Sequence, residues 1–478
     1  MQVTSRRSRF LLVAAWCLIG LGLVLRLRQY LINRSLWLDE AMLALNILHK
    51  DVWGLLGRLD YEQGAPVGFL LLEKLVVTLL GDGERALRLL PFLAGCASLI
   101  LFYLLARQFL SPAGLLTALA LLAISPMLVY YASEVKQYSS DVFVALLLLY
   151  LFTRPWSQRL SYGWLVAGLL ASWFSHPAVF VLAAIGLMLL WQHRQRPWPV
   201  LMLGAAWLAS IGLLYLVNLR GLAQNDFLRA YWSEYFRQNP LTALLGLFEN
   251  PAGLTAVPPL LLLFTVFGAG FLVFRSSPLA FPLLILFVAA FGASWLKLYP
   301  FAGRMVLFLV PFIYLFLASA VDFCAGISWR ARWLSWLLAL ALAGYLLYAP
   351  LTLSVERFLR PKYPEHIRPA IAYLNAHYQT GDTVYVYYWA LPAFRYYADP
   401  AMPYLSGGFY PDNPPALLTE FDALRGRSRV WILFSHVYEK GDYNERNAVL
   451  AYLDEIGKRR RQFLEPGTSV YLYLYDLR

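Results

Sequence analysis

Two adjacent carboxylates, Asp39 and Glu40, follow the first long apolar segment of the chain, at the point where a chain leaving a membrane would reach water. Ionised side chains beside a bilayer are costly to keep and are usually paired or functional. A carboxylate placed there could act as a general base that accepts a proton from a hydroxyl group. A structural reading is also open, because acids at a helix start often cap the helix or favour its dipole.

A second group of charges lies further along the chain, where Glu134 and Asp141 flank Lys136 and Tyr138. We expect this group to face the same side of a membrane as the first pair and to line one cavity with it. Two structural readings remain open. Glu134 and Lys136 could form a solvated loop pair, and Asp141 could be a charge at a helix N-terminus.

The third polar group consists of Lys297, Tyr299 and Arg304, which lead into another apolar segment. Arg304 could bind an anion, or it could anchor a helix at the lipid headgroups while its stem stays in the apolar layer. His176, before Pro177, is more typical of an interfacial histidine than of a ligand. We therefore expect carboxylates and cations to converge on one face.

This combination of groups suits the attack of an acceptor hydroxyl on the anomeric carbon of a sugar 1-phosphate linked to a membrane lipid. A carboxylate such as Asp39 could accept the hydroxyl proton, while Arg or Lys stabilises the departing phosphate. Because phosphate is already a good leaving group, the second carboxylate that a glycosidase uses as an acid is not required.

The composition is that of an integral membrane protein. The 478 residues are 60% hydrophobic and 14% charged, with a mean hydropathy of +0.56. Much of the net charge of +12 lies in short loops, so membrane topology explains it better than nucleic acid does. The three cysteines are scattered, and we expect no disulfide framework. No Asp-x-Asp triplet and no glycine-rich phosphate loop occurs, which argues against a soluble nucleotide-sugar transferase.

Apolar runs predict about eleven membrane-spanning helices. The predicted spans lie near residues 10–30, 86–106, 112–131, 140–153, 161–175, 177–192, 198–218, 254–274, 278–296, 305–323 and 332–352. The first resembles a signal peptide, but no small-residue cleavage pattern follows, so we expect an uncleaved helix.

The distribution of basic residues predicts the sidedness of the chain. If the amino terminus is cytoplasmic, every inner loop is basic, because these loops carry Arg107, Arg154 with Arg159, Arg194 with Arg196, Arg275, and Arg330 with Arg332. Residues 66–80 are apolar enough to compete as a further span, but Glu73 and Lys74 lie in their middle. We therefore expect a juxtamembrane helix there on the outer face, within an outer loop from about 33 to 85.

The composition changes after about Val355. A helix at 364–378, strands at 383–389, 429–434 and 469–475, and a helix at 444–456 predict a small α/β domain outside the membrane. The aromatic residues at 385–397 are more typical of a core than of a sugar-binding platform. We thus expect an α-helical polytopic membrane domain at 1–355, which holds the catalytic site, and an extracytoplasmic α/β domain at 356–478.

Four short motifs in order resemble a known family. They are residues 36–40 (LWLDE), 65–70 (APVGFL), 86–91 (ALRLLP) and 131–139 (YASEVKQYS). They resemble the bacterial members of the protein O-mannosyltransferase-like group, which are GT-C glycosyltransferases. Members often have a Pro-Pro pair where this chain has Ala65-Pro66, a departure that bears on donor or acceptor preference.

The resemblance implies an enzyme of the bacterial cytoplasmic (inner) membrane that transfers a sugar, with inversion, from a polyprenyl-phosphate donor on the outer face. The catalytic aspartate of the family would be Asp39, with Glu40 beside it. The resemblance leaves open the sugar, the acceptor (lipid, protein or polysaccharide) and any divalent metal ion; no organic cofactor and no nucleic acid partner is implied.

Two other classes of protein remain open. A transporter or flippase for a lipid-linked sugar would also need many spans and buried charges, although no inverted repeat is visible. A noncatalytic scaffold could recruit partners through the C-terminal domain.

Overall fold

The computed structural model describes every residue except 1, 156, 237–238, 256, 328–331 and 411–412. The chain divides into two compact units. The first comprises residues 1–32 and 50–360, and the second comprises residues 33–49 and 361–478. The second unit therefore includes a short early segment that the sequence analysis grouped with the membrane helices.

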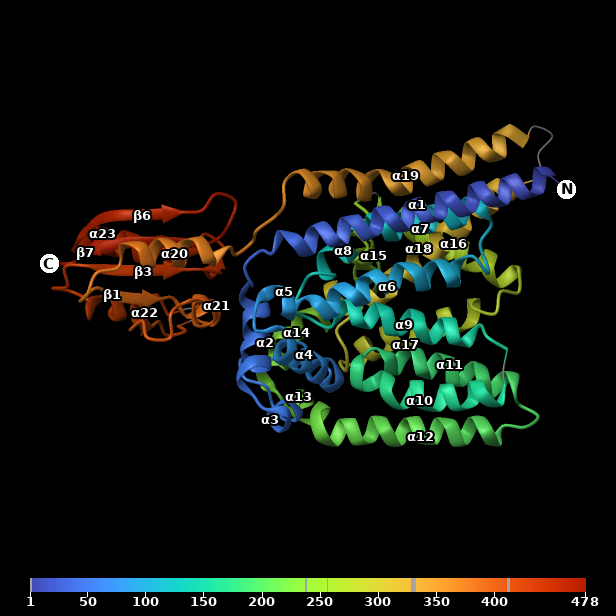
Figure 1. The fold of residues 1–478 in the computed structure, drawn as a ribbon, viewed down its shortest axis with the longest axis horizontal. Helices are drawn as coiled ribbons and strands as arrows, with labels where there is room; N and C mark the ends of the chain where they lie inside the picture. The colour runs from blue at the N-terminus through green and yellow to red at the C-terminus, as the bar shows by residue number, and fades with distance from the viewer. Residues whose placement is uncertain (1, 156, 237–238, 256, 328–331, 411–412) are drawn as a thin grey trace. The chain divides into compact units, whose positions relative to one another are not determined.

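The first unit is helical throughout its described residues (Figure 1). Its helices are α1 (Gln2–Ile32), α3 (Val52–Leu56), α4 (Val67–Leu80), α5 (Glu84–Leu87), α6 (Leu89–Ala106), α7 (Pro112–Ile124), α8 (Pro126–Tyr131), α9 (Tyr138–Phe152), α10 (Gln158–Phe174), α11 (Ala178–Gln192), α12 (Trp198–Leu214) with the π-helical turn η1 (Tyr215–Leu219), α13 (Arg220–Ala223), α14 (Asp226–Phe236), α15 (Pro240–Glu249), α16 (Pro258–Phe274), α17 (Ala280–Trp295), the 3-10 segment η2 (Gly303–Leu309), α18 (Val310–Gly326) and α19 (Arg332–Leu359).

All of the predicted spans coincide with helical segments in the described part of the chain. Among the described residues, five segments are long and apolar enough to cross a membrane unaided: Arg9–Ile32, Glu84–Ala106, Trp198–Ala223, Gly303–Gly326 and Arg332–Leu359. The remaining predicted spans form shorter apolar helices. The existence of these helices is thus confirmed, whereas the number of about eleven crossings stays a prediction.

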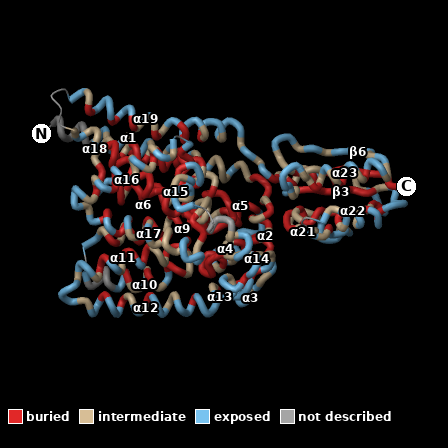
Figure 2. The backbone as a smooth tube through the Cα atoms, turned by 180° about the vertical axis from the view of Figure 1, so that it is seen from behind, coloured by how far each residue is buried: buried red, intermediate tan, exposed pale blue. Residues whose placement is uncertain are grey.

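Burial separates inner from outer helices (Figure 2). In the apolar stretch of η2 and α18, 94% of the residues are buried. In the apolar stretches of α1, α12 and α19, only 22% of the residues are buried. Exposed side chains on these outer helices are largely apolar, as at Met202 and Leu340. An apolar exterior of this kind suits contact with lipid.

Helices α6, α9, α11 and α16 finish at the end of the bundle at which α1 begins (Figure 1). At the close of α6, α9, α11 and α16, an arginine stacks on an aromatic ring of the preceding turn: Arg107 on Tyr103, Arg154 on Tyr150, Arg194 on Trp191 and Arg275 on Phe271. Pairs of this kind are typical of the membrane–water interface. Their placement agrees with the predicted inner face; Arg330 lies outside the described residues.

One predicted span, 112–131, is two helices because Pro126 has no N–H to continue the first of them. The break leaves carbonyl groups of α7 without helical partners. Arg26 of α1, which is 1% exposed, donates to the carbonyl oxygens of Leu122 (3.2 Å) and Ala123 (3.3 Å). A guanidinium inside the apolar bundle thus satisfies backbone groups that lipid could not.

The helix α4 fits the predicted juxtamembrane role. Its 14 residues span about 21 Å at 1.5 Å per residue, which is short of the hydrocarbon thickness of about 30 Å. Leu75 and Leu79 are exposed along one side, while Glu73 is buried. Figure 1 shows α4 beside α3 and α5, at the end of the bundle opposite the stacked arginines.

The second unit is built on a five-stranded sheet in the order β2-β1-β3-β7-β6. Strands β1 (Thr383–Val386), β2 (Leu405–Ser406) and β3 (Val430–Phe434) are parallel, and β7 (Tyr471–Asp476) and β6 (Lys458–Leu464) are antiparallel to their neighbours. The other elements are α2 (Leu38–His49), α20 (Ile367–His377), η3 (Tyr388–Ala390), α21 (Leu391–Tyr397), α22 (Pro414–Asp422), the hairpin β4 (Glu439–Lys440) and β5 (Tyr443–Asn444), and α23 (Glu445–Ile456).

Helices cover both faces of this sheet. The ring of Tyr373 in α20 packs against Trp431 and Phe463 on one face. Tyr385, which points to the opposite face, packs against Phe421 of α22. An α/β arrangement is therefore present, and the tyrosines at 385, 387 and 388 are buried, as expected of core residues.

Candidate functional site

The predicted polar segment 133–141 is buried in the first unit. Glu134 is 0% exposed, and Lys136 and Asp141 are each 4% exposed. The reading of Glu134 and Lys136 as a solvated loop pair is therefore wrong, because neither side chain reaches solvent. Taking ionised groups out of water is costly, so a concentration of them indicates a functional site.

Arg304 approaches this segment from the start of η2. Its Nη1 atom lies 3.9 Å from Oε1 of Glu134, and its guanidinium carbon lies 5.5 Å from the ring centre of Tyr138. Gly303 adopts φ +50°, a left-handed conformation that glycine tolerates, and this turns the chain so that Arg304 enters the unit. Glu134, Tyr138 and Arg304 therefore lie together in the structure, whereas the predicted meeting of Asp39 with Glu134 and Arg304 stays a prediction.

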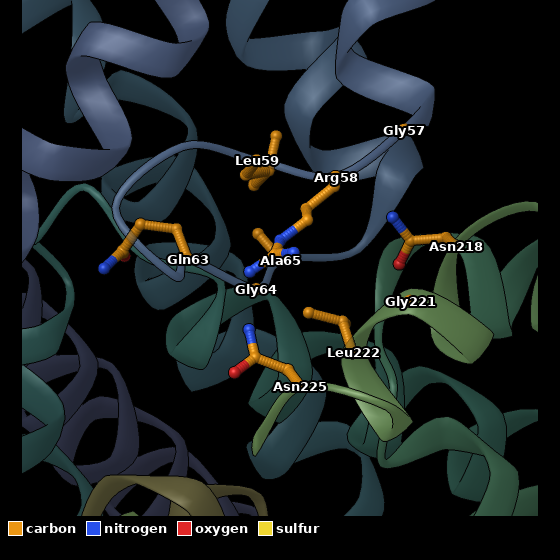
Figure 3. Close-up of a pocket in the computed structure, with 10 residues that line it drawn as sticks. All are labelled: Gly57, Arg58, Leu59, Gln63, Gly64, Ala65, Asn218, Gly221, Leu222 and Asn225. Carbon is orange, nitrogen blue, oxygen red and sulfur yellow. The ribbon is translucent and has the colours of Figure 1, made fainter. Parts of the chain in front are cut away.

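Lys136 connects this cluster to the loop before α4. Its Nζ donates a hydrogen bond of 2.6 Å to Oε1 of Gln63. Gln63 also lines a small hollow between residues 57–65 and residues 218–225 (Figure 3).

Amide side chains dominate the polar wall of this hollow: Gln63, Asn218 and Asn225, together with Arg58 (Figure 3). Asn218 lies in the π-helical turn η1 and is 7% exposed. Its Oδ1 has no hydrogen-bond partner among the described residues. Interruptions of this kind in a helix are frequent at functional sites.

The remaining predicted residues of the first unit have different surroundings. Tyr299 is near Asp141 and Tyr138, but its hydroxyl donates to the carbonyl oxygen of Met305 at 2.7 Å. Asp141 is in the first turn of α9, beside Ser175. Lys297 is exposed and has no partner among the described residues, so the structure does not bring it into the cluster.

Asp39 and Glu40 lie in the second unit, in the first turn of α2. Glu40 is fully buried and forms an ion pair of 3.4 Å with Arg34, which is itself buried. Asp39 is only partly buried. The two carboxylates therefore differ, and only Asp39 is open to a substrate; that it shares a pocket with Glu134 stays a prediction.

The carboxylate of Glu365 meets the start of α2. Its Oε2 accepts a hydrogen bond of 2.8 Å from the backbone N–H of Leu38, and its Oε1 lies 2.6 Å from Nδ1 of His436. The sequence analysis missed Glu365, His436 and Arg34, since no spacing relates residues so far apart in the chain. It also missed Gln63, although Gln63 is adjacent to one of the four motifs.

The structure gives no positive evidence for a bound metal ion. Among the described residues, no group of three His, Cys, Asp or Glu side chains is placed to hold one. His176 is partly buried in the turn between α10 and α11, and its Nε2 has no partner among the described residues. Burial lowers the pKa of His176 to about 4, so this imidazole is neutral near pH 7.

Comparison with known families supports the resemblance seen in the sequence. Residues 64–218 match the family described as dolichyl-phosphate-mannose-protein mannosyltransferase. This segment contains Glu134, Lys136, Tyr138 and Asp141, together with Gln63's neighbour Gly64 and Asn218 of the hollow. The comparison with curated proteins found no match.

Solved structures with the same fold cover nearly the whole chain. ArnT from Cupriavidus metallidurans in the apo state is 14% identical with a TM-score of 0.51, over 99% of this chain and 98% of ArnT. ArnT bound to undecaprenyl phosphate is 15% identical with a TM-score of 0.54, over 96% and 97%. The apo oligosaccharyltransferase of Archaeoglobus fulgidus is 14% identical with a TM-score of 0.51, over 97% of this chain and 74% of that one.

These proteins are GT-C glycosyltransferases. The sequence resemblance is supported over residues 64–218, and the fold of these solved structures is shared over nearly the full length of the chain. Within the class, the matched segment is that of the protein mannosyltransferase-like group.

Proposed function

We propose that the chain is a membrane glycosyltransferase that takes a sugar from a polyprenyl-phosphate donor and transfers it, with inversion, to an acceptor on the outer face of the membrane. The observation that carries this proposal is that two buried ionisable groups, Glu134 and Lys136, lie in the helical bundle, with the partly buried Arg304 beside Glu134. The similarity to an ArnT structure bound to undecaprenyl phosphate supports a donor of this kind.

In this mechanism the cations of the first unit receive the phosphate. Arg304 and Lys136 stabilise the charge that develops on the phosphate as the glycosidic bond breaks. Glu134 holds the guanidinium of Arg304 in the cluster, and Tyr138 supports it through its ring face. No acid is needed, because the polyprenyl phosphate leaves as an anion.

Asp39 acts as the general base. It accepts the proton of the acceptor hydroxyl while the hydroxyl oxygen bonds to the anomeric carbon, and this single displacement inverts that carbon. Glu40, buried against Arg34, supports the helix rather than the chemistry. We assign recognition of sugar hydroxyls to the amide side chains of Gln63, Asn218 and Asn225, which can act as both donors and acceptors.

One assay tests this function. Purified full-length protein in lipid nanodiscs is supplied with a panel of undecaprenyl-phosphate sugars and with lipid and protein extracts as acceptors, and the release of undecaprenyl phosphate is measured. We expect Asp39→Asn to lower turnover at least about 100-fold, the usual contribution of a general base. Asp442→Asn, an exposed carboxylate of the same unit, is the matched control. Absence of turnover with every donor would favour a transporter or a scaffold.

We further propose a bacterial inner-membrane location with the C-terminal unit outside the cytoplasm. In a variant without Cys17, Cys96 and Cys324, single cysteines at the exposed positions Ser406 and Ser157 report the two sides. A membrane-impermeant maleimide added to intact spheroplasts should label the cysteine at 406 and spare the one at 157. The opposite pattern would invert the topology and remove the outer-face assignment.

A further inference from the structure

The start of α2 is capped by a residue from far along the chain. Helix N-termini carry backbone N–H groups without helical partners, and a carboxylate there satisfies them and favours the helix dipole. In α2 the N–H of its first residue, Leu38, donates to Oε2 of Glu365 at 2.8 Å. Asp39 is the next residue, so the position of its side chain depends on this cap.

His436 holds the other oxygen of the same carboxylate. Its Nδ1 lies 2.6 Å from Oε1 of Glu365, which is 7% exposed. His436 follows the end of β3 and adopts φ +53°, so the sheet fixes its place. The hydrogen bond with Glu365 raises the pKa of His436 against the opposing effect of burial, and the charge of Asp39 raises it further.

The segment that leads into α2 is fixed in the same manner. The hydroxyl of Ser35 lies 2.8 Å from Nδ1 of His366, and the backbone N–H of Leu36 donates to the hydroxyl of Tyr397 at 2.7 Å. The chain from Ser35 to Asp39 is therefore bound, almost residue by residue, to side chains of the C-terminal part of its own unit.

We propose that Glu365 and His436 are positioning residues for the general base: Glu365 fixes the first turn of α2, and His436 fixes Glu365, so that Asp39 keeps one orientation. This inference rests on the proposed function of Asp39. Misplacement of a catalytic group by about 1 Å can cost about 100-fold in rate. Loss of the cap should therefore lower kcat and leave the KM for the donor nearly unchanged.

The test combines structure and kinetics in the full-length protein. Glu365→Ala removes both contacts, whereas Glu365→Gln retains an oxygen for the N–H of Leu38 and loses the charge that binds His436. Hydrogen exchange of the amides of residues 38–42 is measured by mass spectrometry, together with kcat and KM for the undecaprenyl-phosphate sugar that gives turnover.

The control is Asp382→Asn, which removes a charge paired with Arg429 at the start of β1 and β3, the end of these strands opposite His436. We expect Glu365→Ala to speed exchange at α2 at least about tenfold and to lower kcat about 100-fold, with donor KM within about threefold. Glu365→Gln should restore most of the protection and part of kcat, and Asp382→Asn should affect neither at temperatures where it is folded.

Unchanged exchange at α2 in Glu365→Ala would overturn the proposal, as would an equal loss of kcat in Asp382→Asn. A different result would show that the proposed function, rather than the positioning role, is wrong. If Asp39→Asn retains full turnover while Glu365→Ala speeds exchange, the cap exists but Asp39 is not the base, and the positioning role falls with it.

Discussion

Nη1 of Arg304 lies 3.9 Å from Oε1 of Glu134, which is close enough for a strong electrostatic attraction and too far for a hydrogen bond. The guanidinium carbon of Arg304 also lies 5.5 Å from the ring centre of Tyr138, so both the carboxylate and the ring face contribute to its position. In the proposed mechanism this guanidinium receives the phosphate of the donor.

Replacement of Arg304 tests this relationship. We expect Arg304→Gln to lower kcat/KM for the donor by about 100- to 1000-fold, since it removes a charge aimed at the leaving group. Arg304→Lys should recover part of the loss, because the charge returns without the planar donors. Steady-state kinetics check both variants, with Arg194→Gln, an exposed arginine of the opposite helix ends, as the control. A similar loss in Arg194→Gln would point to general damage.

The buried Arg26 should be essential for stability rather than for catalysis. Arg26→Gln leaves the carbonyl groups of Leu122 and Ala123 short of their donor, at a cost of about 2 to 4 kcal/mol. Thermal unfolding in detergent should show a lower Tm. Arg85→Gln, at an exposed position, should leave Tm unchanged. An Arg26→Gln protein as stable as wild type would mean that the break at Pro126 needs no donor.

Asp322 of α18 should be needed for the start of α7. Its carboxylate accepts hydrogen bonds of 2.6 Å from the backbone N–H groups of Ser111 and Gly114. Asp322→Ala should cost about 1 to 2 kcal/mol, as loss of an N-cap does. Gly114→Ala should also destabilise, because an added Cβ would lie 2.5 Å from Oδ1 of Asp322. Tm values in detergent check both, and a Gly114→Ala protein of unchanged Tm would show that the carboxylate can move aside.

The protection of α2 should depend on pH through His436. Glu365 raises the pKa of His436 in the folded chain. The stabilisation that the protonated imidazole contributes is therefore fully present below the unfolded-state pKa of about 6.5. It is lost as the pH rises through the higher pKa of the folded state. Protection factors of residues 38–42, corrected for the intrinsic pH dependence of exchange, should fall over that range. In His436→Gln they should stay flat; a fall of equal size there would assign the effect to another group.

The helix positions could be predicted from the sequence because a continuous apolar run in a bilayer must satisfy its own backbone hydrogen bonds, which a helix does. The break at Pro126 was missed because the apolar run continues across the proline. The backbone carbonyl groups that the break leaves without helical partners accept hydrogen bonds from Arg26 of α1. The edge strand β6 was also missed: its residues Lys458 to Gln462 are mostly charged, as suits an exposed edge, and carry no apolar alternation.

The residues of the candidate site were predicted from their type, as charged side chains in an apolar chain, rather than from their spacing in the sequence. Asp39, Glu134 and Arg304 were predicted to meet because isolated charges in an apolar chain are usually functional, and the structure brings Glu134 and Arg304 together. The partners Gln63, Glu365 and His436 could not be found in this way, since each contact joins distant segments and depends on the folded backbone. The same reasoning was wrong for Lys297, because a cation in a loop can remain exposed to water, as Lys297 does.

The unit that contains α2 is assembled from an early and a late segment of the chain, and this affects how the protein is synthesised. The ribosome releases residues 33–49 early, but the residues that complete their unit, 361–478, are synthesised only after all of the helices of the first unit. During all of that time the helix with Asp39 has neither its cap nor its anchoring side chains. The nascent chain therefore passes through most of its membrane insertion with α2 unanchored, and a product truncated near residue 360 would retain Asp39 without the contacts that fix its helix.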